Sequence, residues 1–227
     1  MEVVAVTFVS HWDVSIASSA SEADRKWLAE VRAKAEKGDA HSQCELGRAF
    51  AFGNRGVTQD EVEAVKWYRK AAEQNLVKAQ FYLGICYSQG QGVAKDEVEA
   101  VKWYRKAAEQ NLAPAQYILG ACYAEGQGVA KDEAEAYKWF LLAAGQGDKG
   151  AIKQVDKLKR SMTRRQIAEG QKRARDFKPR EAPSSGSDNS IPRILETRPE
   201  GSGTGFFITE DGYLITNEHV AGNGALV

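Results

Sequence analysis

Apolar residues recur along this chain at the spacing of an α-helix, and the whole pattern repeats every 36 residues. The segment Asp60–Leu76 returns letter for letter at Asp96–Leu112, and a looser copy begins at Asp132. A fixed period of this size indicates one supersecondary unit stacked on itself. The sequence therefore predicts an all-α solenoid in which each unit buries its apolar face against its neighbours.

Each repeat contains two helical patterns separated by a glycine-containing turn. In the first pattern, Ala79, Leu83, Cys86 and Tyr87 lie at i, i+4, i+7 and i+8, which is one face of a helix. In the second pattern, alanines and large aromatic residues share a face. This series is Ala64, Trp67, Tyr68 and Ala71, and it recurs from Ala100 and from Ala136. Because large and small side chains alternate, we expect a packed core here and not a ligand-binding stripe.

Glycine and asparagine mark where the second helices end, and aspartate marks where they begin. The end residues are Gly38, Asn75, Asn111 and Gly147. Both residue types tolerate the left-handed backbone that often follows a helix. The residues Asp60, Asp96 and Asp132 come at helix starts, where a carboxylate caps free amide groups.

Other glycines indicate close packing and turns. Gly84 and Gly120 lie within first helices, where glycine costs about 1 kcal/mol relative to alanine. Their recurrence predicts a neighbouring helix that crosses too closely for a side chain. The G-x-G loops at 90–92 and 126–128 join two helices without a preceding strand, so we interpret them as turns and not as phosphate-binding loops.

The limits of the array follow from the same pattern. We expect a disordered leader over 1–20, an N-terminal capping helix over 21–37, repeats over about 39–75, 76–111 and 112–147, and capping helices over 149–177. Capping-box patterns at Ser21–Asp24 and Thr163–Gln166 support two of the helix starts. The proline-, serine- and glycine-rich stretch 178–200 predicts a flexible linker.

The repeat resembles the Sel1-like repeat, a relative of the tetratricopeptide repeat. The matching patterns are A-Q-x-x-L-G-x-x-Y, G-x-G-V and A-x-x-W-Y/F-x-x-A-A, within about Trp27–Phe177. The run Met162–Gln171 resembles the helix that often closes such arrays. This resemblance implies a right-handed, curved helical scaffold that binds other proteins or peptides.

Partners of such a scaffold would dock on its concave surface, mainly through exposed side chains of the first helices. The contact residues that we expect are Gln43, Gln80, Phe81, Gln116 and Tyr117.

The last segment, 201–227, has a different pattern. Two β-prone runs, 203–209 and 213–217, flank the turn signal 210–212 and predict a hairpin. The motifs G-S-G-T-G-F-F-I and D-G-Y-L-I-T-N-x-H-V resemble the start of a trypsin-like serine peptidase of the HtrA/Deg kind. The resemblance implies a truncated β-barrel and makes His219 the general base. The alternative is a stray hairpin with a solvated histidine.

That family places its orienting Asp and nucleophilic Ser further along the chain than its histidine, so these positions are absent from the 227 residues. About 27 residues are also too few to bury a core. We therefore expect no proteolysis by these 227 residues, and interpret the segment as the front of a longer protein or a gene cut short. Two functions stay open: repeats that recruit substrates or partners to a serine endopeptidase, and a non-enzymatic adaptor.

Charge adds one local feature. The chain has 31 basic and 31 acidic residues, so its net charge indicates no class of partner. Residues 149–180, however, hold twelve Lys and Arg against three acids, 12 − 3 = +9. We interpret this segment as the solvated face of an amphipathic cap. Binding of nucleic acid or an anionic membrane is the alternative that we favour less.

The three cysteines, Cys44, Cys86 and Cys122, form no close pair, which argues against a disulfide framework. No C-x-x-C or nearby histidine supports a metal site, and we expect no cofactor. No run reaches the roughly 20 apolar residues of a membrane helix. Unpaired cysteines and the lack of a clear signal peptide favour the cytoplasm, whereas a signal encoded upstream would place the chain in the cell envelope.

Overall fold

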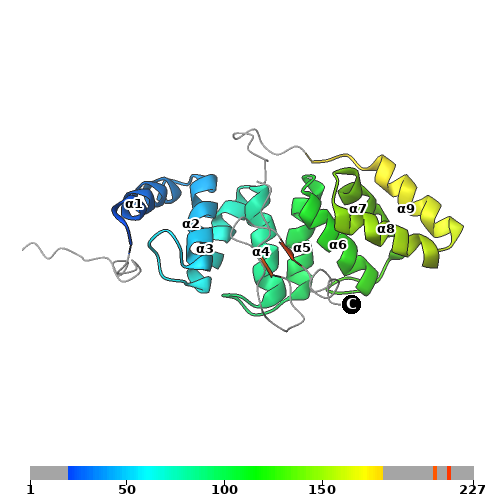
Figure 1. Ribbon diagram of the computed structural model, residues 1–227, viewed down its shortest axis with the longest axis horizontal. Helices are drawn as coiled ribbons and strands as arrows, with labels where there is room; N and C mark the ends of the chain where they lie inside the picture. Colours follow the sequence, from blue (N-terminus) through cyan, green and yellow to red (C-terminus); the bar gives the residue numbers. More distant parts are fainter. Residues whose placement is uncertain (1–19, 181–206, 209–213, 216–227) are drawn as a thin grey trace, which may run out of the picture.

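The computed structural model describes residues 20–180, 207–208 and 214–215. Over residues 20–180 the chain forms nine helices that follow one another in a single row (Figure 1). Their bounds are α1 Glu22–Glu36, α2 Ala40–Phe52, α3 Glu61–Glu73, α4 Val77–Gln89, α5 Glu97–Glu109, α6 Ala113–Glu125, α7 Glu133–Gly145, α8 Lys149–Ser161 and α9 Arg164–Asp176.

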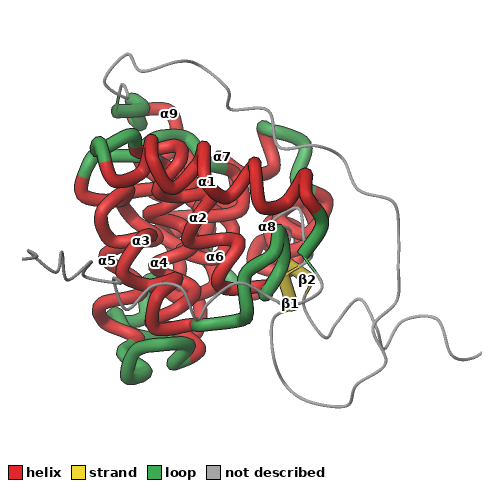
Figure 2. The backbone as a smooth tube through the Cα atoms, turned by 90° about the vertical axis from the view of Figure 1, so that its left-hand side faces the viewer, coloured by secondary structure: helices red, strands yellow, loops and turns green. Residues whose placement is uncertain are grey.

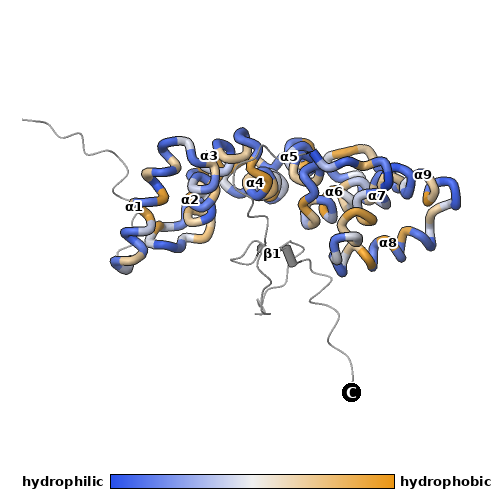
Figure 3. The backbone as a smooth tube through the Cα atoms, turned by 90° about the horizontal axis from the view of Figure 1, so that it is seen from above, coloured by the Kyte–Doolittle hydropathy of each residue, from blue (hydrophilic) through white to orange (hydrophobic). Residues whose placement is uncertain are grey.

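Each repeat is a helical hairpin. Helix α2 packs on α3, α4 on α5 and α6 on α7, and each hairpin also packs on the next. Seen from the α1 end, the helices stack behind one another (Figure 2). The row bends, with α2, α4, α6 and α8 on its inner side and α3, α5 and α7 on its outer side (Figure 3). The predicted all-α solenoid is therefore confirmed for residues 20–180.

The aromatic stripe of the second helices forms the core, as the sequence predicted. Trp67, Trp103 and Trp139 are all buried, as are the aromatic residues that follow each of them. Adjacent repeats share ring contacts: Tyr68 of α3 stacks on Tyr82 of α4 with ring centroids 5.2 Å apart. The apolar face of each hairpin is thus covered by the next hairpin.

The glycines of the first helices lie where an aromatic ring crosses. A Cβ atom on Gly47, Gly84 or Gly120 would come within 2.8, 2.7 or 2.9 Å of the facing ring. The facing rings are those of Tyr68, Tyr104 and Phe140, in that order. Real Cβ atoms essentially never approach so closely, so the predicted close crossing is confirmed.

The predicted helix ends are also confirmed. The residues after successive second helices have positive φ: Gly38 (96°), Asn75 (64°), Asn111 (66°) and Gly147 (90°). Asp60, Asp96 and Asp132 cap α3, α5 and α7 by accepting backbone N–H groups of the first turn. The capping box at Thr163 opens α9.

Two short strands lie in the C-terminal segment. β1 (Phe207–Ile208) pairs with β2 (Leu214–Ile215) in antiparallel fashion, with Phe207 opposite Ile215. These four residues match the predicted hairpin. His219, the predicted leader up to residue 19 and the linker from residue 181 lie outside the described residues. Within the described ranges, no helix has both the length and the apolar character needed to cross a bilayer.

Candidate functional site

The structure buries four of the five residues that we expected to contact a partner. Gln43, Gln80 and Gln116 are only 4%, 1% and 0% exposed, and Phe81 is also buried. Only Tyr117 is half-buried. These four buried residues therefore lack the exposed side chains through which we expected a partner to dock.

The three buried glutamines join neighbouring helices instead. The Nε2 of Gln43 donates to the carbonyl of Ala35 at the end of α1 (3.0 Å), and its Oε1 accepts from Gln74 after α3 (2.7 Å). Gln80 and Gln116 repeat this arrangement, accepting from Gln110 (2.9 Å) and Gln146 (2.8 Å). We call these six residues the glutamine ladder: Gln43, Gln74, Gln80, Gln110, Gln116 and Gln146. The ladder supplies hydrogen-bond partners to buried side-chain amides and to carbonyl groups at helix ends. Its role is therefore structural.

The two predicted aromatic contact residues pack against rings of neighbouring helices. The ring centroid of Phe81 lies 6.1 Å from that of Tyr104 on α5, and 6.0 Å from that of Tyr82, the next residue on its own helix. Tyr117 packs against Phe140 at 5.6 Å while part of its surface stays accessible. Sequence periodicity alone placed both residues on the first helices but could not show which helix would cover them.

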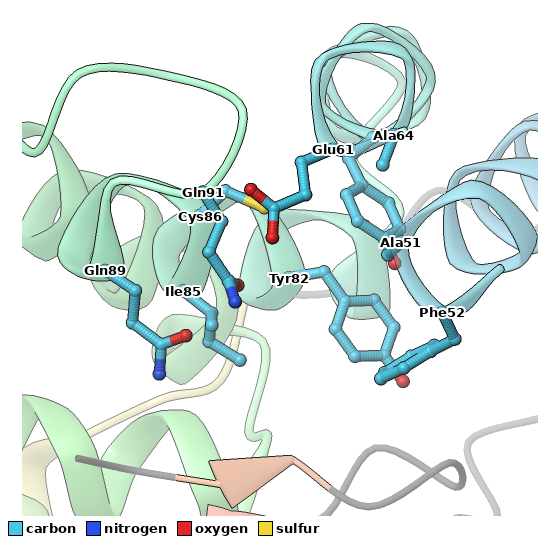
Figure 4. A pocket seen from close by; sticks show the side chains of 10 residues that line it. Ala51, Phe52, Glu61, Ala64, Tyr82, Ile85, Cys86, Gln89 and Gln91 are labelled. Carbon is cyan, nitrogen blue, oxygen red and sulfur yellow. The ribbon is translucent and has the colours of Figure 1, made fainter. Parts of the chain in front are cut away.

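A pocket with a volume of about 220 Å³ opens between α2, α3 and α4 (Figure 4). We call it the α2–α4 pocket. Its described lining residues are Ala51, Phe52, Glu61, Ala64, Tyr68, Tyr82, Ile85, Cys86, Gln89 and Gln91. Phe52 of α2 and Glu61 of α3 belong to one helical hairpin, whereas Tyr82 comes from α4 of the next hairpin, so the pocket exists only because the two hairpins are stacked.

The electrostatics of the α2–α4 pocket suit binding without covalent chemistry. Glu61 is the one charged side chain among its described lining residues. Burial raises the pKa of the Cys86 thiol to about 12, and the nearby Glu61 carboxylate adds to this shift. A thiol with such a pKa is not a nucleophile near neutral pH. Histidine and serine are also missing from the described lining, so no base–nucleophile pair is present there.

Part of the basic segment 149–180 is neutralised within the fold. Arg173 of α9 contacts Asp132 (3.0 Å) and Glu135 (3.1 Å) at the start of α7, and Glu169 (2.9 Å) on its own helix. This arginine therefore fastens the last helix to the third repeat. In the part of the chain that the structure describes, no group of three or more His, Cys, Asp or Glu is arranged to hold a metal ion.

Comparisons with known proteins agree with the helical repeat. A family model for the Sel1 repeat matches residues 40–76, 77–112 and 113–148. A Sel1 repeat protein from Oxalobacter formigenes is 41% identical with a TM-score of 0.54, and the match covers 58% of this chain and 98% of that chain. The protective antigen c5321 of uropathogenic Escherichia coli, described as an SLR fold, is 26% identical with a TM-score of 0.51, covering 72% of this chain and 46% of that one.

One further match is to a peptidase. A stretch of 28 residues is 64% identical to a probable periplasmic serine endoprotease, DegP-like, of Rhizobium meliloti (strain 1021). This stretch is 12% of the present chain and 6% of that protein, so the chain matches only a small part of that relative's length.

Proposed function

Because this chain belongs to the Sel1-repeat family, we propose that its row of helical hairpins is a scaffold that binds protein partners. The 41% identity over nearly the whole length of the Oxalobacter formigenes Sel1 repeat protein carries this proposal. The fold supports it, since stacked hairpins bury their cores between repeats and leave an extended surface available for binding.

The inner side of the row, along α2, α4, α6 and α8, is the proposed binding surface (Figure 3). Its helices supply most of the described lining of the α2–α4 pocket, and α6 carries the half-buried Tyr117, the one expected contact residue that keeps accessible surface. Ala121 of α6 occupies the position that Ile85 has in α4, 36 residues earlier. Ala121, which is half-buried, is therefore the α6 position that corresponds to this part of the pocket lining.

Site-specific crosslinking in the organism that encodes the chain tests this surface. The photocrosslinker p-benzoylphenylalanine would replace either Ala121 on the inner side or Lys102, an exposed residue of α5 on the outer side. We expect a discrete crosslinked protein from the Ala121 position and none from the Lys102 position. Equal crosslinking from both positions, or none from either, would contradict the proposal.

A second candidate function is that the repeats recruit substrates to a trypsin-like serine endopeptidase encoded by the same gene. The motif T-N-x-H-V and the 28-residue match to a DegP-like protein favour it. His219 would then be the general base, which takes the proton of the nucleophilic serine. The remaining alternative is an adaptor without enzymatic activity.

Reading the gene beyond codon 227 separates these two candidates. An aspartate followed by a G-[DN]-S-G-G-like stretch is expected for the peptidase, and the full product should then cleave an unfolded protein such as casein. His219→Ala should lower that rate by several orders of magnitude. A product without these residues, or cleavage that survives His219→Ala, would leave only the scaffold.

A further inference from the structure

The first repeat lacks an ion pair that the next two repeats contain. Glu97 pairs with Lys95 (3.0 Å), and the equivalent Glu133 pairs with Lys131 (3.8 Å). In the first repeat the corresponding residues are Glu61 and Gln59. The three positions are structurally equivalent, because the residue before the capping aspartate faces the glycine that ends the first helix in each repeat.

The loss of this lysine leaves a carboxylate available at the α2–α4 pocket. Within the described part of the chain, Glu61 has neither an ion pair nor a side-chain hydrogen bond, although it is half-buried. Figure 4 shows its carboxylate and the amide of Gln91 at one end of the pocket and the rings of Phe52 and Tyr82 at the other. One end of the pocket is therefore acidic and polar, and the other is aromatic.

The corresponding interface between the second and third repeats is built differently. Ser88 stands where the first interface has Ala51, and its hydroxyl shares a hydrogen bond with Tyr104 (3.0 Å). Ile118 stands where the first interface has Tyr82. The aromatic wall and the unpaired carboxylate thus occur together at the first interface, although the second helices α3 and α5 have identical sequences.

The volume of the α2–α4 pocket limits the size of the group that it can bind. A volume of about 220 Å³ is below the roughly 300–1,000 Å³ of clefts that bind drug-sized ligands, but it suits a single side chain. A carboxylate attracts a cation, and aromatic faces attract both a cation and its aliphatic stem. The neighbouring cation Arg48 is already paired with Glu45 at 2.9 Å.

We propose that the α2–α4 pocket receives a lysine or arginine side chain of a partner polypeptide, with Glu61 as its counter-ion. The rings of Phe52 and Tyr82 then cover the aliphatic stem of that side chain. This inference rests on the proposed scaffold function and adds to it the chemistry of the partner: a basic residue displayed on an accessible segment.

A titration with short peptides tests the pocket directly. The isotope-labelled 227-residue chain would be titrated with acetyl-Gly-Gly-Arg-Gly-Gly-amide, and backbone amide signals of Glu61 and Gln91 would be followed by NMR. The matched probes carry citrulline, the neutral isostere of arginine, or leucine at the central position. We expect the arginine peptide to bind and Glu61→Gln to weaken that binding about five- to tenfold.

Two further variants control for the change of charge. Glu97→Gln makes the same substitution one repeat later, and it should leave the affinity of the arginine peptide unchanged. Gln59→Lys restores the lysine of the other repeats beside Glu61, and it should weaken binding as much as Glu61→Gln. Both positions lie on the surface at a helix start, so neither change removes a core contact.

Several outcomes would overturn the proposal. They include equal binding of the citrulline or leucine peptide, an unchanged affinity in Glu61→Gln, and no shift with any probe. If substituting Arg193 and Arg198 by glutamine strengthened binding, the chain's own linker would be the occupant and not a partner. None of these outcomes removes the crosslinks expected at Ala121, so failure of the pocket is distinguishable from failure of the scaffold function.

Discussion

Glycine has two opposing effects at the middle of a first helix. It destabilises a helix by about 1 kcal/mol relative to alanine because the free backbone has more freedom to lose. At Gly84, however, an added Cβ would meet the ring of Tyr104 at 2.7 Å. Tyr104 is buried and its hydroxyl is held by Ser88, so the ring has little room to move. Steric overlap should therefore outweigh the gain in helix propensity.

Gly84→Ala should lower the free energy of unfolding by about 1–3 kcal/mol, the usual effect of overpacking a core. Urea denaturation followed by tryptophan fluorescence measures it. Gly145→Ala is the control, because nothing lies within 4 Å of a Cβ on that helical glycine. That change should be neutral or stabilise the fold by up to about 1 kcal/mol. A stabilised Gly84→Ala variant would contradict the close crossing.

The buried glutamines give a second prediction at the scale of single residues. Gln80→Leu keeps a similar volume but removes the hydrogen bond that Gln80 donates to the Ala72 carbonyl and the one that it accepts from the Gln110 amide. Because both groups would lose hydrogen bonds in or near the core, unfolding should require about 1–3 kcal/mol less. The same urea titration measures this loss. Gln127→Leu, on an exposed loop, should have little effect, and equal losses in the two variants would exclude a special role for the ladder.

At the scale of helices, the aspartate caps link stability to pH. The carboxylate of Asp39 caps α2 and accepts the N–H of Ser42 at 2.7 Å. Hydrogen bonds from the Ser42 side chain and backbone lower the pKa of Asp39 below its ordinary value of 3.8. A carboxyl group whose pKa is lower in the folded state stabilises the fold fully above its unfolded pKa. That contribution is lost as the pH falls through the folded pKa.

Asp39→Asn should therefore change the pH dependence more than the stability at neutral pH, since asparagine caps helices about as well as aspartate. The unfolding free energy of the wild type minus that of the variant should be constant above about pH 5 and should fall below about pH 4, because only the wild type loses a charged cap there. Thermal denaturation at a series of pH values measures this difference. A wild type that became more stable relative to the variant on acidification would contradict the predicted sign.

At the scale of the whole molecule, each hairpin is stabilised by its neighbours, so the ends of the row need other contacts. The last helix, α9, packs on α7 and is fastened there by Arg173. Arg173 contacts three carboxylates at once, and such networks contribute more than isolated surface pairs. The basic residues of this segment therefore include one whose role is to close the array.

Arg173→Ala should loosen α9 by about 1 kcal/mol while the central repeats stay folded. Hydrogen exchange of the α9 amides should speed up about three- to tenfold, with little change in α4 and α5. Arg175→Ala removes the same charge from an exposed position on the same helix and serves as the control. Equal acceleration by the two variants would show that charge, and not the contacts of Arg173, sets the stability of α9.

The sequence alone determined the repeat, the two helices of each unit, their capped ends and the buried Trp67, Trp103 and Trp139. These features are local, because periodicity, capping residues and glycine positions act within a few residues of one another. Tertiary structure decided the rest. Gln80 was expected on the surface because it is polar. In the fold it is buried, and its side chain forms hydrogen bonds with the carbonyl of Ala72 near the end of α3 and with the side-chain amide of Gln110. The α2–α4 pocket likewise depends on how two repeats meet, which no single helix encodes.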